Sequence, residues 1–192
     1  PDYCSAIHAD GAGTKSSVAY IAYRETGDLK WFRQIAQDSL VMNTDDLACV
    51  GALDKLSLSN TIGRNAHRVD GKCIAAVIEG YNNIVAKLQD MGFDLTMCGG
   101  ETADVGDLVR TLIVDSTLVT RVARKNVINA ANIKPGHVIV GLASFGQATY
   151  EDSYNSGISS NGLTAARHML LSNYYAQNFK ESYSDTIPED KA

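Results

Sequence analysis

A glycine-rich segment near the start of the chain has the residue types of a phosphate and cation site. Asp10-Gly11-Ala12-Gly13-Thr14-Lys15 lies between a short apolar run and a helical pattern. Backbone N–H groups are free at such a junction, and the helix dipole favours an anion there. The Lys15 ammonium suits a phosphate oxygen, and the Asp10 carboxylate suits a hard cation such as Mg²⁺. The alternative is a plain glycine-rich turn with a solvated lysine.

Two further polar groups interrupt apolar patterns. Asn43, Asp45 and Asp46 fall within an otherwise apolar helical stretch. Because unpaired buried carboxylates are costly, these side chains should face a cation, a partner base or water, or lie at a solvated helix end. Gly99-Gly100-Glu101-Thr102-Ala103-Asp104 follows an apolar strand pattern, where glycines let the backbone approach a ligand closely. This second motif is weak on its own.

The elements that must position these groups follow from the hydrophobic periodicity. Apolar and alternating runs predict strands over residues 3–9, 55–61, 93–98 and 111–122. Apolar residues at spacings of three and four predict helices over residues 16–26, 31–50 and 73–91. The long runs 55–61 and 111–122 would leave strand edges exposed in a monomer, which favours a dimer through them.

A domain boundary is expected near Pro135 and Gly136, which precede a new apolar run over residues 137–143. We expect that run to be a strand, and a helix to extend from Gly162 to about Phe179 with Ser160 as its cap. One strand and one helix cannot bury a core, and the chain does not begin with methionine. The predicted fold is therefore α/β (α+β): an N-terminal sheet-and-helix domain over 1–133 and an incomplete C-terminal α/β domain over 134–192.

The composition excludes several classes of protein. With 17 basic against 22 acidic residues, the formal charge of −5 argues against a nucleic-acid backbone as the main partner. No apolar run approaches the roughly 20 residues of a membrane-spanning helix, so no membrane partner is expected. The four histidines are scattered and form no visible metal cluster. The cysteines have no C-x-x-C spacing and are expected to be buried, reduced thiols of a cytosolic protein: Cys4, Cys49, Cys73 and Cys98. Cys98, beside Gly99, is the one candidate covalent nucleophile, although a buried thiol is the favoured interpretation.

The order of the motifs resembles the aminoimidazole ribonucleotide synthetase (phosphoribosylformylglycinamidine cyclo-ligase) family of purine synthesis. D-G-A-G-T-K, an Asp pair in an apolar helix, G-G-E-T-A-D, G-L-A-S and S-N-G follow one another within residues 9–167. The family's S-S-G-x-H-S-N-G segment matches at Ser144-Phe145-Gly146 and at Ser160-Asn161-Gly162, but residues 147–159 are inserted and Ser159 replaces the histidine.

The resemblance implies roles for individual residues. Asp10 and Asp46 would serve Mg²⁺ and nucleotide phosphates, while Asp45 stands where asparagine is usual and Asp104 replaces a glutamate. The implied catalytic residues are Lys15, Asp46 and Glu101, and the implied metal ligands are Asp10, Asp46 and Glu101. The implied ATP-binding set is Asp10, Gly11, Gly13, Thr14, Lys15, Asp45, Gly99, Gly100 and Asn161. We expect the three metal-binding carboxylates to lie within about 8 Å of one another.

The resemblance also implies an activity. It predicts an ATP- and Mg²⁺-dependent cyclo-ligase that converts formylglycinamidine ribonucleotide to aminoimidazole ribonucleotide, ADP and phosphate by phosphorylating an amide oxygen. The predicted setting is a cytoplasmic homodimer whose N-terminal sheets join. Two alternatives stay open: another ATP-dependent superfamily member, similar to selenophosphate synthetase or thiamine monophosphate kinase, and a non-catalytic dimerising fragment.

Overall fold

The computed structural model describes residues 1–143, 145–149, 151–154 and 158–186. Its framework is a four-stranded sheet in the order β1-β4-β2-β3. The strands are β1 (Tyr3–Gly11), β2 (Leu56–Arg64), β3 (Leu95–Asp104) and β4 (Leu112–Ala123). β4 is antiparallel to both of its neighbours, whereas β2 and β3 are parallel. The mixed sheet confirms the predicted α/β class for the N-terminal part of the chain.

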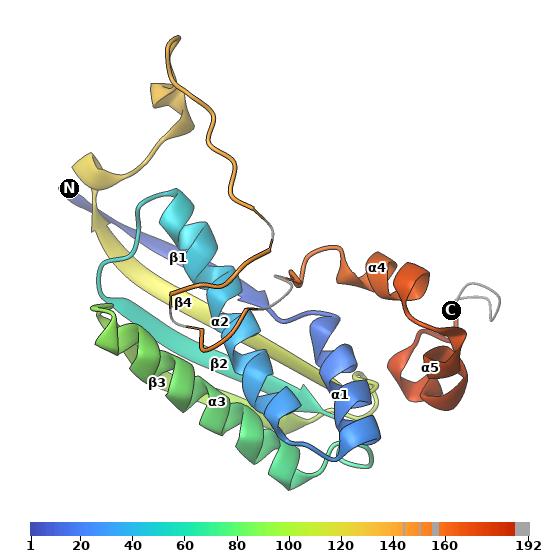
Figure 1. The fold of residues 1–192 in the computed structure, drawn as a ribbon. Coiled ribbons are helices and arrows are strands. Elements are labelled where there is room, and N and C mark those ends of the chain that lie inside the picture. Colours follow the sequence, from blue (N-terminus) through green and yellow to red (C-terminus); the bar gives the residue numbers. More distant parts are fainter. Residues whose placement is uncertain (144, 150, 155–157, 187–192) are drawn as a thin grey trace.

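Three helices cover one face of this sheet (Figure 1). They are α1 (Lys15–Thr26), α2 (Lys30–Cys49) and α3 (Gly71–Asp90). α3 begins where the Asp70 side chain accepts a hydrogen bond from the Cys73 backbone N–H, and α1 ends at Gly27, whose φ of 71° needs a glycine. All three predicted N-terminal helices are thus confirmed, with ends that differ by one or two residues.

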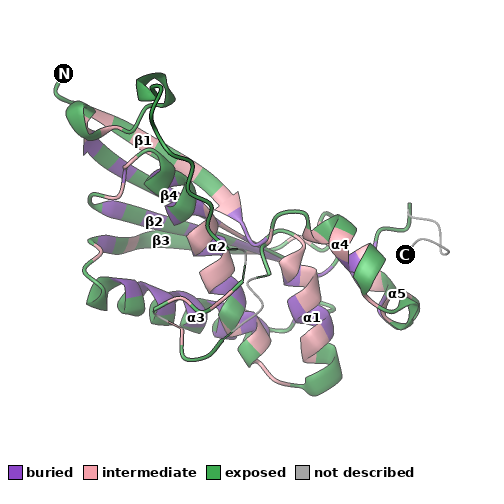
Figure 2. Cartoon of the chain, turned by 45° about the horizontal axis from the view of Figure 1, so that its top comes forward, coloured by how far each residue is buried: buried purple, intermediate pink, exposed green. Residues whose placement is uncertain are grey.

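Burial alternates along the strands, as Figure 2 shows. On β4, Leu112, Val114, Leu118 and Val122 are buried on the helix-covered face. The odd-numbered residues of β4 point the other way, where Val119 is 42% exposed and Ile7 of β1 is 71% exposed. One face of the sheet therefore holds the core, and the other carries exposed apolar side chains.

The strand order corrects one expectation. β2 and β4, the strands predicted to leave exposed edges, are the two central strands and are paired on both sides. The edges belong to β1 and β3 instead. The sequence pattern identifies a strand by its own residues but does not reveal its neighbours, so the edge argument for a dimer was wrong.

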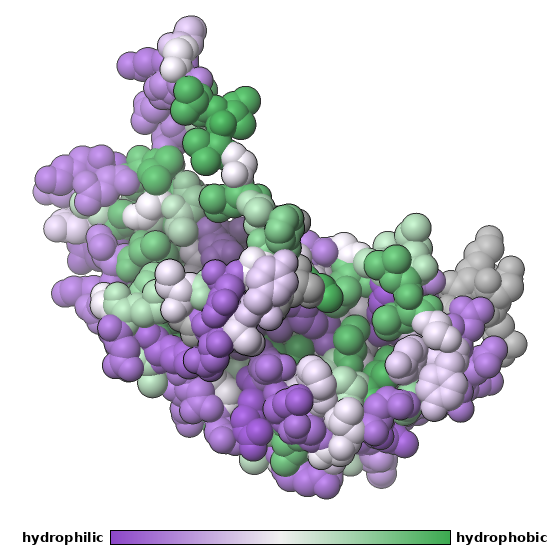
Figure 3. All heavy atoms as spheres, viewed as in Figure 1, coloured by the Kyte–Doolittle hydropathy of each residue, from purple (hydrophilic) through white to green (hydrophobic). Residues whose placement is uncertain are grey.

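The C-terminal part departs further from its prediction. Residues 137–143 form no strand and are all exposed, because no neighbouring strand pairs with their backbone. Five apolar side chains stay exposed over residues 133–142: Ile133, Val138, Ile139, Val140 and Leu142. Figure 3 shows hydrophobic atoms, in green, on the upper part of the molecule's surface. Among the described residues of 134–192 there are helices but no strand, so the start of an α/β domain is not seen there.

The single predicted helix over 162–179 is two helices, α4 (Leu163–Leu170) and α5 (Asn173–Asn178). The chain is extended at Leu171, with φ and ψ of −80° and 150°, which ends α4. Ser160 is not the cap: α4 begins after Gly162 with no side-chain cap, whereas the Ser172 hydroxyl caps α5. Short 3-10 turns complete the order: η1 (Arg124–Asn126), η2 (Ala130–Asn132) and η3 (Lys180–Ser182).

These C-terminal helices lie beside α1 (Figure 1). The Tyr20 hydroxyl donates a hydrogen bond to the Glu181 carboxylate at 2.7 Å, and Phe179 and Tyr183 are buried in the core. No helix in the described part of the chain is both long and apolar enough to cross a membrane.

The cysteines are free, but the expectation that all are buried was wrong. Cys73 is buried on α3, Cys4 is partly exposed, and Cys49 and Cys98 are exposed. Cys49 is the last residue of α2. Cys98 is the extra residue of a β-bulge, because the pairing of β2 with β3 passes from Leu58–Met97 to Ser59–Gly99.

Candidate functional site

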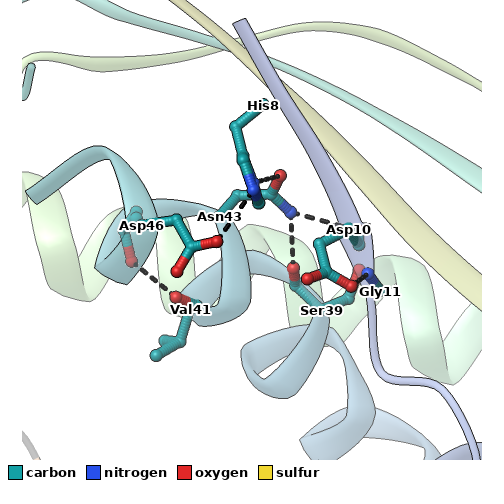
Figure 4. A network of polar contacts seen from close by, with 8 residues as sticks. His8, Asp10, Gly11, Ser39, Val41, Asn43 and Asp46 are labelled. Carbon is teal, nitrogen blue, oxygen red and sulfur yellow. Dashed lines mark hydrogen bonds and ion pairs between the residues drawn. The ribbon is translucent and has the colours of Figure 1, made fainter. Parts of the chain in front are cut away.

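The candidate site lies where β1 ends against α2. His8 and Asp10 are two residues apart on β1, so both side chains leave the strand on its helix-covered face. Asn43 and Asp46 are three residues apart on α2 and share one face of that helix. Figure 4 shows the two pairs directed toward each other.

Short contacts connect these side chains. His8 Nε2 lies 2.8 Å from Asp46 Oδ2, and His8 Nδ1 lies 3.0 Å from Asn43 Oδ1. Asp10 Oδ1 accepts a hydrogen bond from the Gly11 N–H at 2.7 Å. One ligand atom from each of His8, Asp10 and Asp46 lies within 4.8 Å of the others, a separation that a single divalent cation can span.

The structure thus brings together two of the three carboxylates expected to converge, and adds a histidine that the sequence interpretation missed. A signal was present, since His8 lies in the predicted strand 3–9 and Asp10, two residues later, directly follows that strand. This signal was not recognised because Asn43 and Asp46 are far from His8 in the sequence.

Glu101, the third expected carboxylate, does not join this cluster. The registers align Gly11 with Asp115, Asp115 with Thr61, and Thr61 with Glu101 across the sheet. Three strand spacings of about 4.8 Å place the Glu101 backbone roughly 14 Å from that of Gly11. The same register puts Glu101 on the uncovered face with Thr61, opposite to the side that carries Asp10. The expected convergence within one chain was therefore wrong for Glu101, and its catalytic and metal-binding roles stay predictions.

The glycine-rich turn connects β1 to α1. The N–H groups of Gly13 and Thr14 have no acceptor among the described residues, and the first turn of α1 contains no acidic side chain. Gly13 has a φ of 53°, and a Cβ on Gly11 would lie 1.8 Å from Asp115 Oδ1 and 2.7 Å from the Val114 carbonyl oxygen. The glycines therefore allow the tight turn and leave two donors open for an anion.

Lys15 is not a solvated side chain. Its Nζ lies 2.6 Å from Asp38 Oδ1 on α2 and also donates to the backbone oxygen of Ile158. The hydroxyl of Thr14 contacts that of Thr164, so residues near 158–164 reach the turn. Asn161 lies in this segment and donates its N–H to Ser159 Oγ at 3.1 Å.

Sequence reasoning also missed Asp38. It precedes Asp46 by eight residues, close to two helical turns, so both lie on the same side of α2. Burial raises the pKa of the Asp38 carboxyl, and the nearby Lys15 ammonium opposes that shift. Burial together with the Asp46 charge raises the pKa of Asp45, and burial with the Asp10 charge raises that of Asp115. The cluster is an acidic environment in which added positive charge is favourable.

The Gly-Gly-Glu motif has a structural use in β3. A Cβ on Gly100 would lie 1.7 Å from Asn60 Oδ1, and Gly99 has a φ of 156° beside the bulge. Asp104, which follows this motif, accepts a hydrogen bond from the Ala66 N–H at 3.1 Å. These contacts account for the glycines through the pairing of β3 with β2.

Comparison with known proteins adds the family context. A family model described as AIR synthase related protein, N-terminal domain, matches residues 1–122. Phosphoribosylformylglycinamidine cyclo-ligases are similar over most of this chain: that of Thermococcus kodakarensis is 31% identical over 173 residues, and that of Pyrococcus furiosus is 32% identical over 175. The chain covers 44% of each of these two relatives, and each alignment includes 90% of the chain.

Solved structures show more distant similarity. T. maritima PurL complexed with ADP gives a TM-score of 0.46 at 16% identity, covering 70% of this chain and 19% of its own. Thiamine-monophosphate kinase from Stenotrophomonas maltophilia K279a gives 0.41 at 19% identity, covering 66% of this chain and 34% of its own. The match over residues 1–122 takes in more than half of the sequence, and the chain therefore belongs to the AIR synthase related family through its N-terminal domain.

Proposed function

We propose that this chain is the ATP- and Mg²⁺-binding part of a cytoplasmic cyclo-ligase of purine biosynthesis. The proposed reaction converts formylglycinamidine ribonucleotide to aminoimidazole ribonucleotide, with ATP consumed to ADP and phosphate. The observation that carries the proposal is the meeting of Asp10 and Asp46 beside the glycine-rich turn. The cyclo-ligase relatives support the choice of reaction, and the chain spans slightly under half of their length.

The donor set fits a nucleotide polyphosphate with its cation. The open N–H groups of Gly13 and Thr14 and the Lys15 ammonium suit phosphate oxygens, while Asp10 and Asp46 suit Mg²⁺. Gly11, Asp45, Gly99, Gly100 and Asn161 complete the proposed nucleotide-binding set. Glu101 lies on the uncovered face of the sheet, so its proposed metal-binding and catalytic role would be carried out apart from Asp10 and Asp46.

The proposed chemistry relies on positioning and charge. A formamide oxygen is a poor leaving group, so its phosphorylation allows an intramolecular amine to close the imidazole ring and displace phosphate. Bound Mg²⁺ would supply neutralising charge to the phosphate oxygens. The turn binds the phosphate through its N–H groups, Lys15 adds positive charge, and Asp38 orients Lys15.

We also propose the domain division and assembly that this function requires. Residues 1–133 would form the nucleotide-binding and dimerisation domain, and residues 134–192 would begin a second domain. The exposed apolar side chains of the uncovered sheet face, among them Tyr3, Ile7, Ile113 and Val119, support a homodimer through that face.

The test uses the full-length protein. ADP formation should require both ATP and formylglycinamidine ribonucleotide, and the ribonucleotide product should appear in equal amount. Thiamine monophosphate and selenide serve as acceptor controls. ATP consumption with one of these controls, and not with formylglycinamidine ribonucleotide, would assign the chain to another branch of the superfamily.

A further inference from the structure

The buried amide of Asn43 determines which nitrogen of His8 carries a proton. Asn43 is fully buried, and its Nδ2 donates to the Asp10 carbonyl oxygen at 3.1 Å and to the Ser39 carbonyl oxygen at 3.0 Å. A reversed amide would place Oδ1 against these two acceptors, so the orientation follows from the hydrogen bonds. Oδ1 therefore faces His8 Nδ1 at 3.0 Å as an acceptor, and Nδ1 must be the donor.

With its proton on Nδ1, a neutral ring would direct the Nε2 lone pair at Asp46. Nε2 and Asp46 Oδ2 are 2.8 Å apart. Two acceptors at that distance repel, so the contact requires positive charge, either a second proton on the ring or a cation bound by both groups. Neighbouring ligands of one cation, with bonds of about 2.1 Å at right angles, lie about 3 Å apart. The distance between His8 Nε2 and Asp46 Oδ2 is close to this separation. A histidine that binds a metal through one ring nitrogen is commonly oriented by a hydrogen bond from the other nitrogen, and the contact of His8 Nδ1 with Asn43 Oδ1 is of that kind.

Asp10 supplies the third ligand. Its Oδ1 is held by the Gly11 N–H, which fixes the carboxylate while the other oxygen stays available. The Asp46 side chain is 59% exposed, so a cation can enter from solvent and keep water or phosphate oxygens in its remaining positions. A site with one imidazole nitrogen and two carboxylates suits transition-metal cations, whereas Mg²⁺ favours oxygen ligands alone.

We propose that His8, Asp10 and Asp46 form a mixed nitrogen and oxygen site that binds divalent transition-metal cations, with Mn²⁺ as the test ion, more tightly than Mg²⁺. The proposal deepens the proposed function, because it names the class of cation at the same two carboxylates. It rests on three side chains of this chain, and its test needs no turnover.

The experiment titrates the metal-free chain with Mn²⁺ alone and follows free Mn²⁺ by electron paramagnetic resonance. Mg²⁺ is then added as a competitor. We expect His8→Ala to weaken Mn²⁺ binding at least about tenfold while Mg²⁺ binding changes little, because only Mn²⁺ uses the imidazole nitrogen strongly. His67→Ala, at an exposed histidine away from the site, should match the wild type.

A second measurement does not depend on any variant. Pulsed electron paramagnetic resonance of the Mn²⁺-loaded wild-type chain should show coupling to one imidazole ¹⁴N. Absence of that coupling, or equal Mn²⁺ affinities in wild type and His8→Ala, would overturn the proposal and leave His8 as an ion-pair partner of Asp46. Nitrogen coupling in a protein that makes no ADP would uphold this site while rejecting the proposed reaction.

Discussion

Lys15 Nζ lies 2.6 Å from Asp38 Oδ1 and connects the first residue of α1 to the middle of α2. The two side chains are only 18% and 26% exposed. A lysine paired in this way loses much of its freedom, so its ammonium stays beside the glycine-rich turn. The pair therefore holds the Lys15 ammonium next to the proposed phosphate site before a ligand arrives.

Replacing this charge tests the phosphate role of Lys15. In the full-length enzyme we expect Lys15→Met to lower kcat/KM for ATP by about 10- to 100-fold, because a charge-assisted contact is lost while the apolar stem is kept. A parallel fall in kcat indicates a contact made mainly in the transition state, whereas a rise in KM alone indicates ground-state binding. Steady-state kinetics over a range of ATP concentrations separates the two.

Lys30→Met is the matched control, since Lys30 is half exposed at the start of α2 and contacts only its sequence neighbours Asp28 and Trp31 among the described residues. Its kinetics should equal those of the wild type. A normally folded Lys15→Met enzyme with unchanged kcat/KM would remove Lys15 from the phosphate site.

Asp38, the partner of Lys15, makes the stability of the folded chain depend on pH. Because burial raises the pKa of Asp38 above the ordinary 3.8 despite Lys15, the folded chain binds this proton more tightly than the unfolded chain. The contribution of Asp38 to the free energy of unfolding is therefore greatest at low pH and falls as pH rises from 3.8 through the higher folded pKa. The difference between wild type and Asp38→Asn, measured by urea unfolding from about pH 4 to 7, should decrease over that window. A difference that grows with pH would mean that Lys15 stabilises the carboxylate more than burial penalises it.

Local patterns predicted the N-terminal elements well, because hydrophobic periodicity acts over a few residues. They failed where the outcome depends on a neighbour. Residues 137–143 are apolar enough for a strand, but no described strand pairs with them. Likewise Glu101 shares a motif with the proposed site residues, yet strand order and side-chain alternation place it on the other face of the sheet. His8 is the opposite case: no sequence motif linked it to the site, but the folded structure places it next to Asp46.

The uncovered sheet face leads to a prediction about assembly. We expect the chain to form a dimer and Ile7→Lys to weaken it at least about tenfold, because a charge replaces an apolar side chain that is 71% exposed on that face. Leu108→Lys makes the same change at a site that is 86% exposed between β3 and β4 and should leave the dimer intact. Light scattering over a range of protein concentrations measures both. A monomer mass for the wild type at all concentrations would contradict the assembly.

The packing of α3 on α2, which holds the site's helix against the sheet, depends on Gly80. A Cβ there would lie 2.1 Å from the Arg33 carbonyl oxygen and 3.0 Å from the Ala36 Cβ, so the backbones of two helices would have to separate. We expect Gly80→Ala to lower the free energy of unfolding by about 1–3 kcal/mol. Gly71→Ala makes the same change in the first turn of α3, where a Cβ meets nothing within 4 Å, and should be neutral or stabilising by up to about 1 kcal/mol. Urea unfolding of both variants provides the comparison, and equal stabilities would show that the helices can move apart without cost.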